Sequence, residues 1–195
     1  FDKFYGFISG AGNYFKPEGP RFIFEGNNKI EINDEDYYTT DAFTDKAIEY
    51  IDGAKSENQE NPFFLYLSYN APHWPLHAHP EDIVRYEGVY DDGYEVIRKA
   101  RYQNQLKQGL FEAKTAPLSD QENAEWSTLS ECEKKEEALR MQIHAAMVDR
   151  MDQNIGRLVE KLSIMQKLEN TLIFFLVDNG SSHEKPKRGM KNEAA

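Results

Sequence analysis

Two apolar runs of strand length, separated by a long amphipathic helix, constrain the fold of this chain more than any other feature. Residues 63–69 (FFLYLSY) and residues 171–177 (TLIFFLV) are almost continuously apolar. Such runs are typical of strands that are buried on both faces of a sheet. The order strand, helical crossover and strand predicts an α/β domain, with a mixed, mostly parallel sheet flanked by helices.

The segment between the two runs carries the clearest helical signal, at residues 131–167. Its apolar side chains recur at steps of three and four, which marks one buried face of a helix. This stripe consists of Leu139, Ile143, Met147, Met151, Ile155, Leu158, Leu162 and Met165.

Shorter elements are predicted elsewhere in the chain. Residues 21–32 show apolar positions on both sides of a turn at Glu25-Gly26-Asn27-Asn28, which predicts a β-hairpin. Residues 37–51 have apolar positions at helical spacing, and short helices are expected within residues 80–90 and 94–108.

Length and charge limit the function classes. We expect one domain over residues 1–195, truncated at both ends and therefore an internal fragment of a longer protein. The formal charge of −11 works against binding to nucleic acid or anionic lipid, so no nucleic-acid partner is expected. The longest apolar run is far shorter than the roughly 20 residues of a membrane-spanning helix, so no transmembrane segment is expected.

Polar side chains follow both predicted strands at the point where each strand ends. The first run is followed by Asn70-Ala71-Pro72-His73-Trp74-Pro75, and the second by Asp178-Asn179-Gly180. Ligand sites in open α/β sheets gather at the carboxyl ends of the strands. If the two strands are parallel neighbours, both clusters lie at the same edge of the sheet, and this predicts a site there.

Asp178 and Asn179 place a carboxylate beside an amide carbonyl. Both are hard oxygen ligands that suit Ca²⁺ or Mg²⁺, although two adjacent residues cannot complete a coordination sphere of six or more oxygens. The alternative interpretation is a tight turn after a strand, and the pattern by itself favours the turn.

His73 is the candidate for proton transfer or anion binding. Pro72 and Trp74-Pro75 stiffen the backbone around it, and a fixed imidazole can donate a hydrogen bond to a charged oxygen or act as a general acid. The alternative, which the residues alone favour, is a loop histidine that packs on Trp74. A zinc site with His77 and His79 is disfavoured, because the loop is broken by prolines and has no carboxylate partner.

Two further charged groups have open interpretations. Asp149 and Asp152 share one face of the long helix, where solvated surface or a salt bridge with Arg150 or Arg157 is favoured over a site. The basic residues within 185–191 form either an anion-binding loop or a solvated tail, and the tail is favoured.

Several stretches together resemble the sulfatase family, and they occur in the family's order. The most specific is Pro62–Tyr69 followed by Ala71–Pro75. The others are residues 1–7 with 10–15, residues 36–42, residues 145–152 with 155–156, and residues 170–173 with 178–180.

The resemblance implies an alkaline phosphatase-like fold and hydrolysis of small-molecule or carbohydrate sulfate esters with Ca²⁺. The family's nucleophile is a formylglycine made from a Cys or Ser in a Cys/Ser-x-Pro-x-Arg motif. By this resemblance His73 contacts the sulfate or assists the leaving group, and Asp178 and Asn179 are calcium ligands. The family is often exported, which favours a periplasmic or secreted location.

The rest of the family's site is expected upstream of this chain: the nucleophile, an Asp-Asp pair of calcium ligands and a Gly-Lys-Trp-His motif. Cys132, the only cysteine, is followed by Glu133-Lys134-Lys135 and does not match the nucleophile motif. The isolated 195 residues are therefore expected to be inactive.

Two alternatives remain open. One is a phosphodiesterase or phosphonate hydrolase of the same superfamily, which shares the fold and much of the site. The other is a non-catalytic, decayed paralogue. The segment after Gly180 supports the second, because Lys185, Lys187 and Lys191 do not align with the family's sulfate-binding lysine.

Overall fold

The computed structural model describes residues 1–10, 12–57, 62–120 and 124–180, with the backbone alone at 54–57. The chain divides into two compact units. The first unit comprises residues 1–77 together with the part of the chain from residue 148 onward, and the second comprises residues 78–147. The expectation of a single domain over residues 1–195 stays a prediction.

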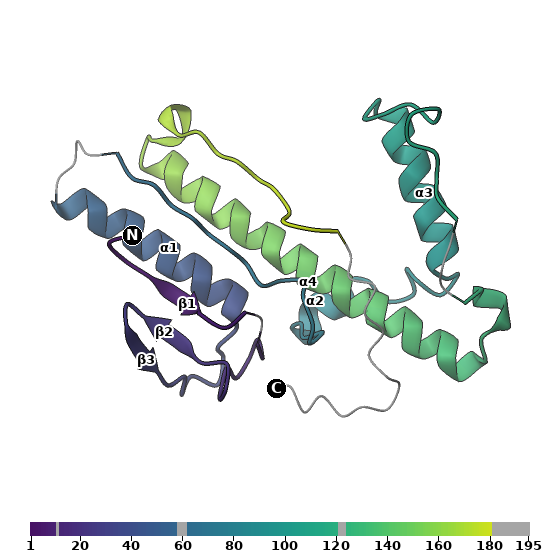
Figure 1. Ribbon diagram of the computed structural model, residues 1–195, viewed down its shortest axis with the longest axis horizontal. Coiled ribbons are helices and arrows are strands. Elements are labelled where there is room, and N and C mark those ends of the chain that lie inside the picture. Colours follow the sequence, from purple (N-terminus) through teal and green to yellow (C-terminus); the bar gives the residue numbers. More distant parts are fainter. Residues whose placement is uncertain (11, 58–61, 121–123, 181–195) are drawn as a thin grey trace. The chain divides into compact units, whose positions relative to one another are not determined.

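The first unit begins with a small antiparallel sheet in the order β1-β2-β3, made of β1 (Tyr5–Phe7), β2 (Ile23–Glu25) and β3 (Asn28–Ile30) (Figure 1). The hairpin predicted for residues 21–32 is confirmed as β2 and β3. Its two-residue turn starts at Gly26, whose φ of +58° is a conformation that favours glycine.

Aromatic side chains form the core beside this sheet. Ile23, Tyr37 and Phe43 are buried together. The Phe43 ring meets the rings of Tyr5 and Phe7 edge to face, with centroids 6.0 Å apart in both pairs. Aromatic pairs in this geometry contribute about 0.5–1.5 kcal/mol beyond the area that they bury.

Two predicted helices of the first unit are confirmed with shifted ends. The helix expected at residues 37–51 is α1 (Thr39–Glu57), and the helix expected at residues 131–167 is α4 (Glu131–Ile164) (Figure 1). A short 3-10 helix, η2 (Leu168–Asn170), follows α4. The unit boundary lies within α4, so only its residues from 148 onward belong to the first unit.

Ion pairs join α1 to this part of α4. They link Asp41 with Arg150, Asp45 with Arg157 and Asp52 with Lys161. The partners ascend together along both helices, so α1 and α4 run in the same direction. The sequence suggests partners on α4 itself for Arg150 and Arg157, whereas the structure pairs both with α1.

Residues 63–69 are extended, but the prediction that they are buried on both faces is wrong. Burial alternates along the segment, with half-buried odd-numbered residues and exposed even-numbered ones. Leu67 and Tyr69 pack against the aromatic core, while Phe64 is 78% and Tyr66 71% exposed. The described residues supply a covering layer on one face of the segment only.

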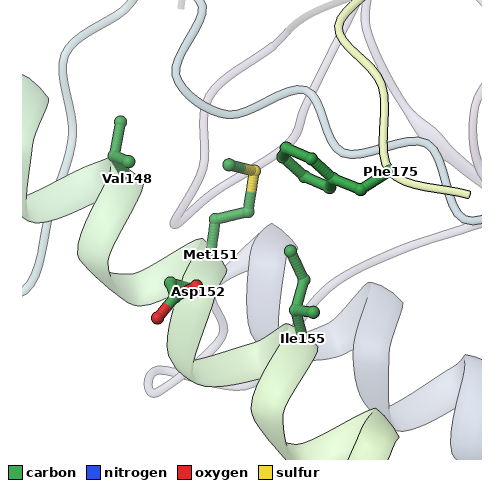
Figure 2. A pocket seen from close by; sticks show the side chains of 5 residues that line it. All are labelled: Val148, Met151, Asp152, Ile155 and Phe175. Carbon is green, nitrogen blue, oxygen red and sulfur yellow. The ribbon is translucent and has the colours of Figure 1, made fainter. Parts of the chain in front are cut away.

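Residues 171–177 are also extended and are not buried as predicted. Exposure across Leu172–Val177 ranges from 49% to 80%. Phe175 lines a shallow hollow of about 220 Å³ together with Met151 and Ile155 of α4, and its ring points toward Met151 (Figure 2). The segment therefore has one side chain, that of Phe175, in the lining of a hollow on α4.

The mostly parallel sheet is therefore not confirmed. Among the described residues, neither extended segment is paired into a ladder, and the three strands present are antiparallel. An extended segment becomes a strand only when a neighbour accepts and donates its backbone hydrogen bonds. The apolar residues predicted the extended conformation of both segments, but they do not show which strand would pair with either one.

The second unit contains the two shorter predicted helices, which are confirmed as α2 (Pro80–Val84) and α3 (Tyr94–Lys107). A 3-10 helix, η1 (Trp126–Thr128), packs at the start of α3. Gly93 precedes α3 with φ +90°, and a Cβ at this position would lie 2.5 Å from the Trp126 ring. Glycine is therefore required there by both backbone conformation and space.

Within the part of the chain that the structure describes, no helix has the length and apolarity needed to cross a membrane.

Candidate active site

His73 lies in the loop of residues 70–77, directly after the extended segment 63–69. Its backbone N–H donates to the Asn70 carbonyl at 2.9 Å, which closes a tight turn. Its side chain is exposed. The loop thus presents the imidazole to solvent on a backbone that is itself hydrogen-bonded.

One hydrogen bond defines the tautomer of His73. Its Nδ1 atom lies 2.7 Å from the Trp74 carbonyl oxygen. Because a carbonyl only accepts, Nδ1 carries the proton, and Nε2 is left to face a ligand. The sequence suggested that the imidazole packs on Trp74, whereas the structure shows a hydrogen bond to the Trp74 backbone carbonyl, which orients the imidazole.

Two buried tyrosines, Tyr14 and Tyr38, donate hydrogen bonds to the backbone of this loop. The Tyr14 hydroxyl donates to the carbonyl oxygens of Asn70 and His73, at 2.9 Å in both cases. The Tyr38 hydroxyl donates to the His77 carbonyl oxygen at 2.8 Å. The two rings stack with centroids 5.5 Å apart, and each is at most 1% exposed. The loop is tied at both ends to one aromatic pair.

His77 has a structural role in this arrangement. Its Nδ1 atom accepts the backbone N–H of Tyr14 at 3.5 Å, and its ring packs against Tyr14 and Phe15. Burial lowers the pKa of the His77 imidazole, so the neutral form that accepts this bond is favoured.

We expect the protein to lose stability at mildly acidic pH because of His77. Below about pH 6.5 the unfolded chain binds a proton at this imidazole, while the folded protein does so only at its lower pKa. The free energy of unfolding therefore falls as pH falls through this window, and it is fully restored above the unfolded pKa.

The measurement compares the wild-type full-length protein with His77→Gln in urea unfolding at about pH 7.5 and about pH 5.5. The difference in free energy of unfolding between the wild type and the variant should be smaller at the lower pH. An equal difference at both pH values would show that His77 is not buried as a neutral group.

Asp178 and Asn179 lie in a bend directly after the extended segment 171–177, and both are exposed. The Asn179 amide nitrogen donates to the Gly180 carbonyl oxygen at 2.6 Å. A cation would bind the other end of this amide, at Oδ1, together with the Asp178 carboxylate. The bend therefore fits the turn interpretation, and the bond to Gly180 uses the amide nitrogen of Asn179 and not its Oδ1.

Neither candidate cluster is a complete metal site by itself. Among residues 1–10, 12–57, 62–120 and 124–180, no group of three or more His, Cys, Asp or Glu side chains could hold a metal ion. Convergence of His73 with Asp178 and Asn179 stays a prediction. The basic residues within 185–191 lie outside the described residues.

Sequence reasoning missed the tyrosines beneath the loop and the polar cluster at the start of α1. In that cluster Asp41 accepts from Arg150 Nε at 2.8 Å and from Asn154 Nδ2 at 2.7 Å. The signals were weak: Tyr14 stood in a segment of glycines and aromatics, and Asn154 was one polar residue beside an apolar stripe.

Comparison with known proteins finds similarity along the whole chain. The family model described as Sulfatase matches residues 1–195. The chain is 32% identical over 190 residues to the arylsulfatase of Klebsiella aerogenes, covering 93% of this chain and 40% of that protein. It is 31% identical over 195 residues to an uncharacterised sulfatase of Schizosaccharomyces pombe, covering 93% of this chain and 35% of that protein.

A third relative is more distant. The uncharacterised sulfatase YdeN of Escherichia coli is 26% identical over 186 residues, covering 95% of this chain and 24% of that protein. The chain thus spans between about a quarter and two fifths of the length of these curated relatives.

Proposed function

Because the chain belongs to the sulfatase family, we propose that the protein containing it hydrolyses sulfate esters with the help of bound Ca²⁺. Family membership implies an alkaline phosphatase-like fold, and members of this family generally use a divalent metal. The observation that carries the substrate class is the match of all 195 residues to the family, with one relative named as an arylsulfatase.

His73 is proposed to act on the sulfate group or on the leaving group. Its Nδ1–H is engaged by the Trp74 carbonyl at 2.7 Å, which directs Nε2 away from the backbone. In the imidazolium form Nε2 donates a hydrogen bond to a sulfate oxygen, or a proton to the departing oxygen. Its exposure gives a substrate access to this atom.

Asp178 and Asn179 are proposed as two of the calcium ligands. Both offer oxygen atoms, which Ca²⁺ prefers, and the Asn179 bond to Gly180 uses the amide nitrogen rather than Oδ1. When bound, the cation stabilises negative charge on the sulfate oxygens. The remaining ligands would come from parts of the protein other than residues 1–195.

The nucleophile is proposed to be a formylglycine formed in a Cys/Ser-x-Pro-x-Arg motif. Residues 1–195 contain no such motif, and the exposed Cys132 is followed by Glu-Lys-Lys. We therefore expect residues 1–195 to be inactive by themselves, and the full-length protein to be the active species.

Calcium removal and ester selectivity test the proposal together. The full-length protein should hydrolyse 4-nitrophenyl sulfate faster than bis(4-nitrophenyl) phosphate, and should lose this activity to a chelator until Ca²⁺ is added back. Asp178→Ala should raise the Ca²⁺ concentration needed for half activity by more than about tenfold, because a direct ligand is lost.

Asp92→Ala is the matched control, since Asp92 is an exposed aspartate that is not one of the proposed ligands. Preference for the phosphodiester would favour a phosphodiesterase. Absence of both activities, together with no Ca²⁺ binding in calorimetry, would favour a decayed paralogue.

A further inference from the structure

The hydrogen bonds of Tyr14 act on the peptide group next to the imidazole of His73. The His73 carbonyl belongs to the peptide group that joins His73 to Trp74, and it accepts the Tyr14 hydroxyl at 2.9 Å. This peptide group lies between the imidazole and the Trp74 carbonyl. Its orientation therefore governs the 2.7 Å bond that sets the tautomer of His73.

The backbone N–H of His73 is fixed through the same hydroxyl. It donates to the Asn70 carbonyl at 2.9 Å, and that carbonyl also accepts the Tyr14 hydroxyl at 2.9 Å. Both backbone polar groups of His73 thus depend on Tyr14, one directly and one through Asn70. The Tyr14 proton is shared between two carbonyls that lie three residues apart.

Tyr14 is suited to this task because it is buried and remains protonated. Burial, with a smaller contribution from the neighbouring Tyr38, raises the pKa of the Tyr14 phenol well above its ordinary value. The ring is 0% exposed and is held by stacking on Tyr38. The hydroxyl therefore acts as a fixed donor and does not reach solvent or substrate.

We infer that Tyr14 is a positioning residue for His73, because its hydroxyl fixes the turn from Asn70 to His73 so that Nε2 faces the substrate. This inference rests on the proposed function for its catalytic consequence. It assigns a buried side chain, 59 residues away in sequence, to the control of the reacting imidazole.

Tyr14→Phe in the full-length protein is the test, because it keeps the ring and removes both hydrogen bonds. We expect kcat/KM for an aryl sulfate to fall about tenfold, since a misdirected imidazole is a weaker proton donor. In a His73→Ala background the same substitution should change kcat/KM by less than about twofold, because the group being positioned is absent.

Tyr50→Phe is the matched control. Its hydroxyl also donates to a backbone carbonyl, that of Phe4, at 3.2 Å in the same unit, but it does not contact the loop. This variant should leave kcat/KM unchanged in both backgrounds. An equal loss from Tyr14→Phe in both backgrounds would reduce Tyr14 to a structural residue and overturn the inference.

A second readout does not depend on activity. In full-length protein labelled with ¹⁵N-histidine, the His73 ring should show the Nδ1–H tautomer, and Tyr14→Phe should convert it to a mixture of tautomers. An unchanged ring spectrum in Tyr14→Phe would overturn the inference. If the wild-type protein hydrolyses no sulfate ester, the proposed function fails, while the ring spectrum still decides whether Tyr14 positions His73.

Discussion

Replacing His73 by alanine in the full-length protein is expected to lower kcat for aryl sulfate hydrolysis by a factor on the order of 10²–10⁴, the range attributed to a positioned general acid. The loop aims Nε2 away from the backbone by engaging Nδ1 with the Trp74 carbonyl. Alanine removes the donor, so the departing oxygen leaves as an unassisted anion.

The loss should grow as the leaving group becomes more basic, because a poor leaving group depends most on proton donation. The measurement is kcat for a series of aryl sulfates whose phenols differ in pKa. His144→Ala, at an exposed position of α4 in the second unit, is the control and should match the wild type throughout. Wild-type turnover by His73→Ala would remove His73 from the mechanism.

Replacing Asp41 by alanine is expected to have the largest effect on stability, a loss of about 1–3 kcal/mol in the free energy of unfolding. Asp41 Oδ2 lies 2.6 Å from Arg150 Nη2, and these side chains are only 21% and 25% exposed. Asn154, 1% exposed, donates to the same carboxylate at 2.7 Å. The substitution removes this acceptor from a partly buried guanidinium and from an amide that is almost fully buried.

Asp45→Ala is the matched control for this prediction. Asp45 pairs with Arg157 across the same two helices, but these side chains are 59% and 45% exposed. Exposed ion pairs contribute about 0–1 kcal/mol, so this variant should be almost as stable as the wild type. Urea unfolding of both variants measures the difference, and equal losses would show that the Asp41 cluster is not specially buried.

The double variant Asp41→Ala with Arg150→Met extends the test. Removing both charges should recover part of the stability, because much of the loss comes from leaving one charge unpaired. If the double variant recovers no stability, the loss in Asp41→Ala comes from the broken hydrogen bond of Asn154 or from the packing of α1.

Local signals predicted the local structure well. The spacing of apolar residues predicted α1 and α4, and Gly26 within its turn predicted the hairpin of β2 and β3. These elements depend on contacts between residues close in sequence, which a pattern can register. The loop carrying His73 was also placed correctly, since its prolines exclude regular structure.

The sheet could not be predicted in the same way. Residues 63–69 and 171–177 are extended as expected, but a strand is defined by its neighbours, and pairing between distant segments leaves no mark in either segment alone. Their exposed apolar side chains show that composition predicts a tendency toward burial, whereas the covering layers must come from other parts of a fold.

The supports of the candidate site were missed for a related reason. Tyr14 lies 56 residues before Asn70 in sequence, and Asp41 lies 113 residues before Asn154. Each of these residues had an ordinary interpretation by itself, as an aromatic core residue or a helix-start aspartate. Only the folded backbone shows that they converge.

The central claim is that His73, Asp178 and Asn179 serve one sulfate-binding site, and a crystal structure of the full-length protein with Ca²⁺ and a sulfate ester analogue tests it most directly. We expect the Asp178 carboxylate and Asn179 Oδ1 at about 2.3–2.6 Å from the cation. His73 Nε2 should lie about 2.7–3.2 Å from an oxygen of the bound analogue. A cation held without Asp178 and Asn179, or a His73 ring beyond the reach of the analogue, would contradict the claim.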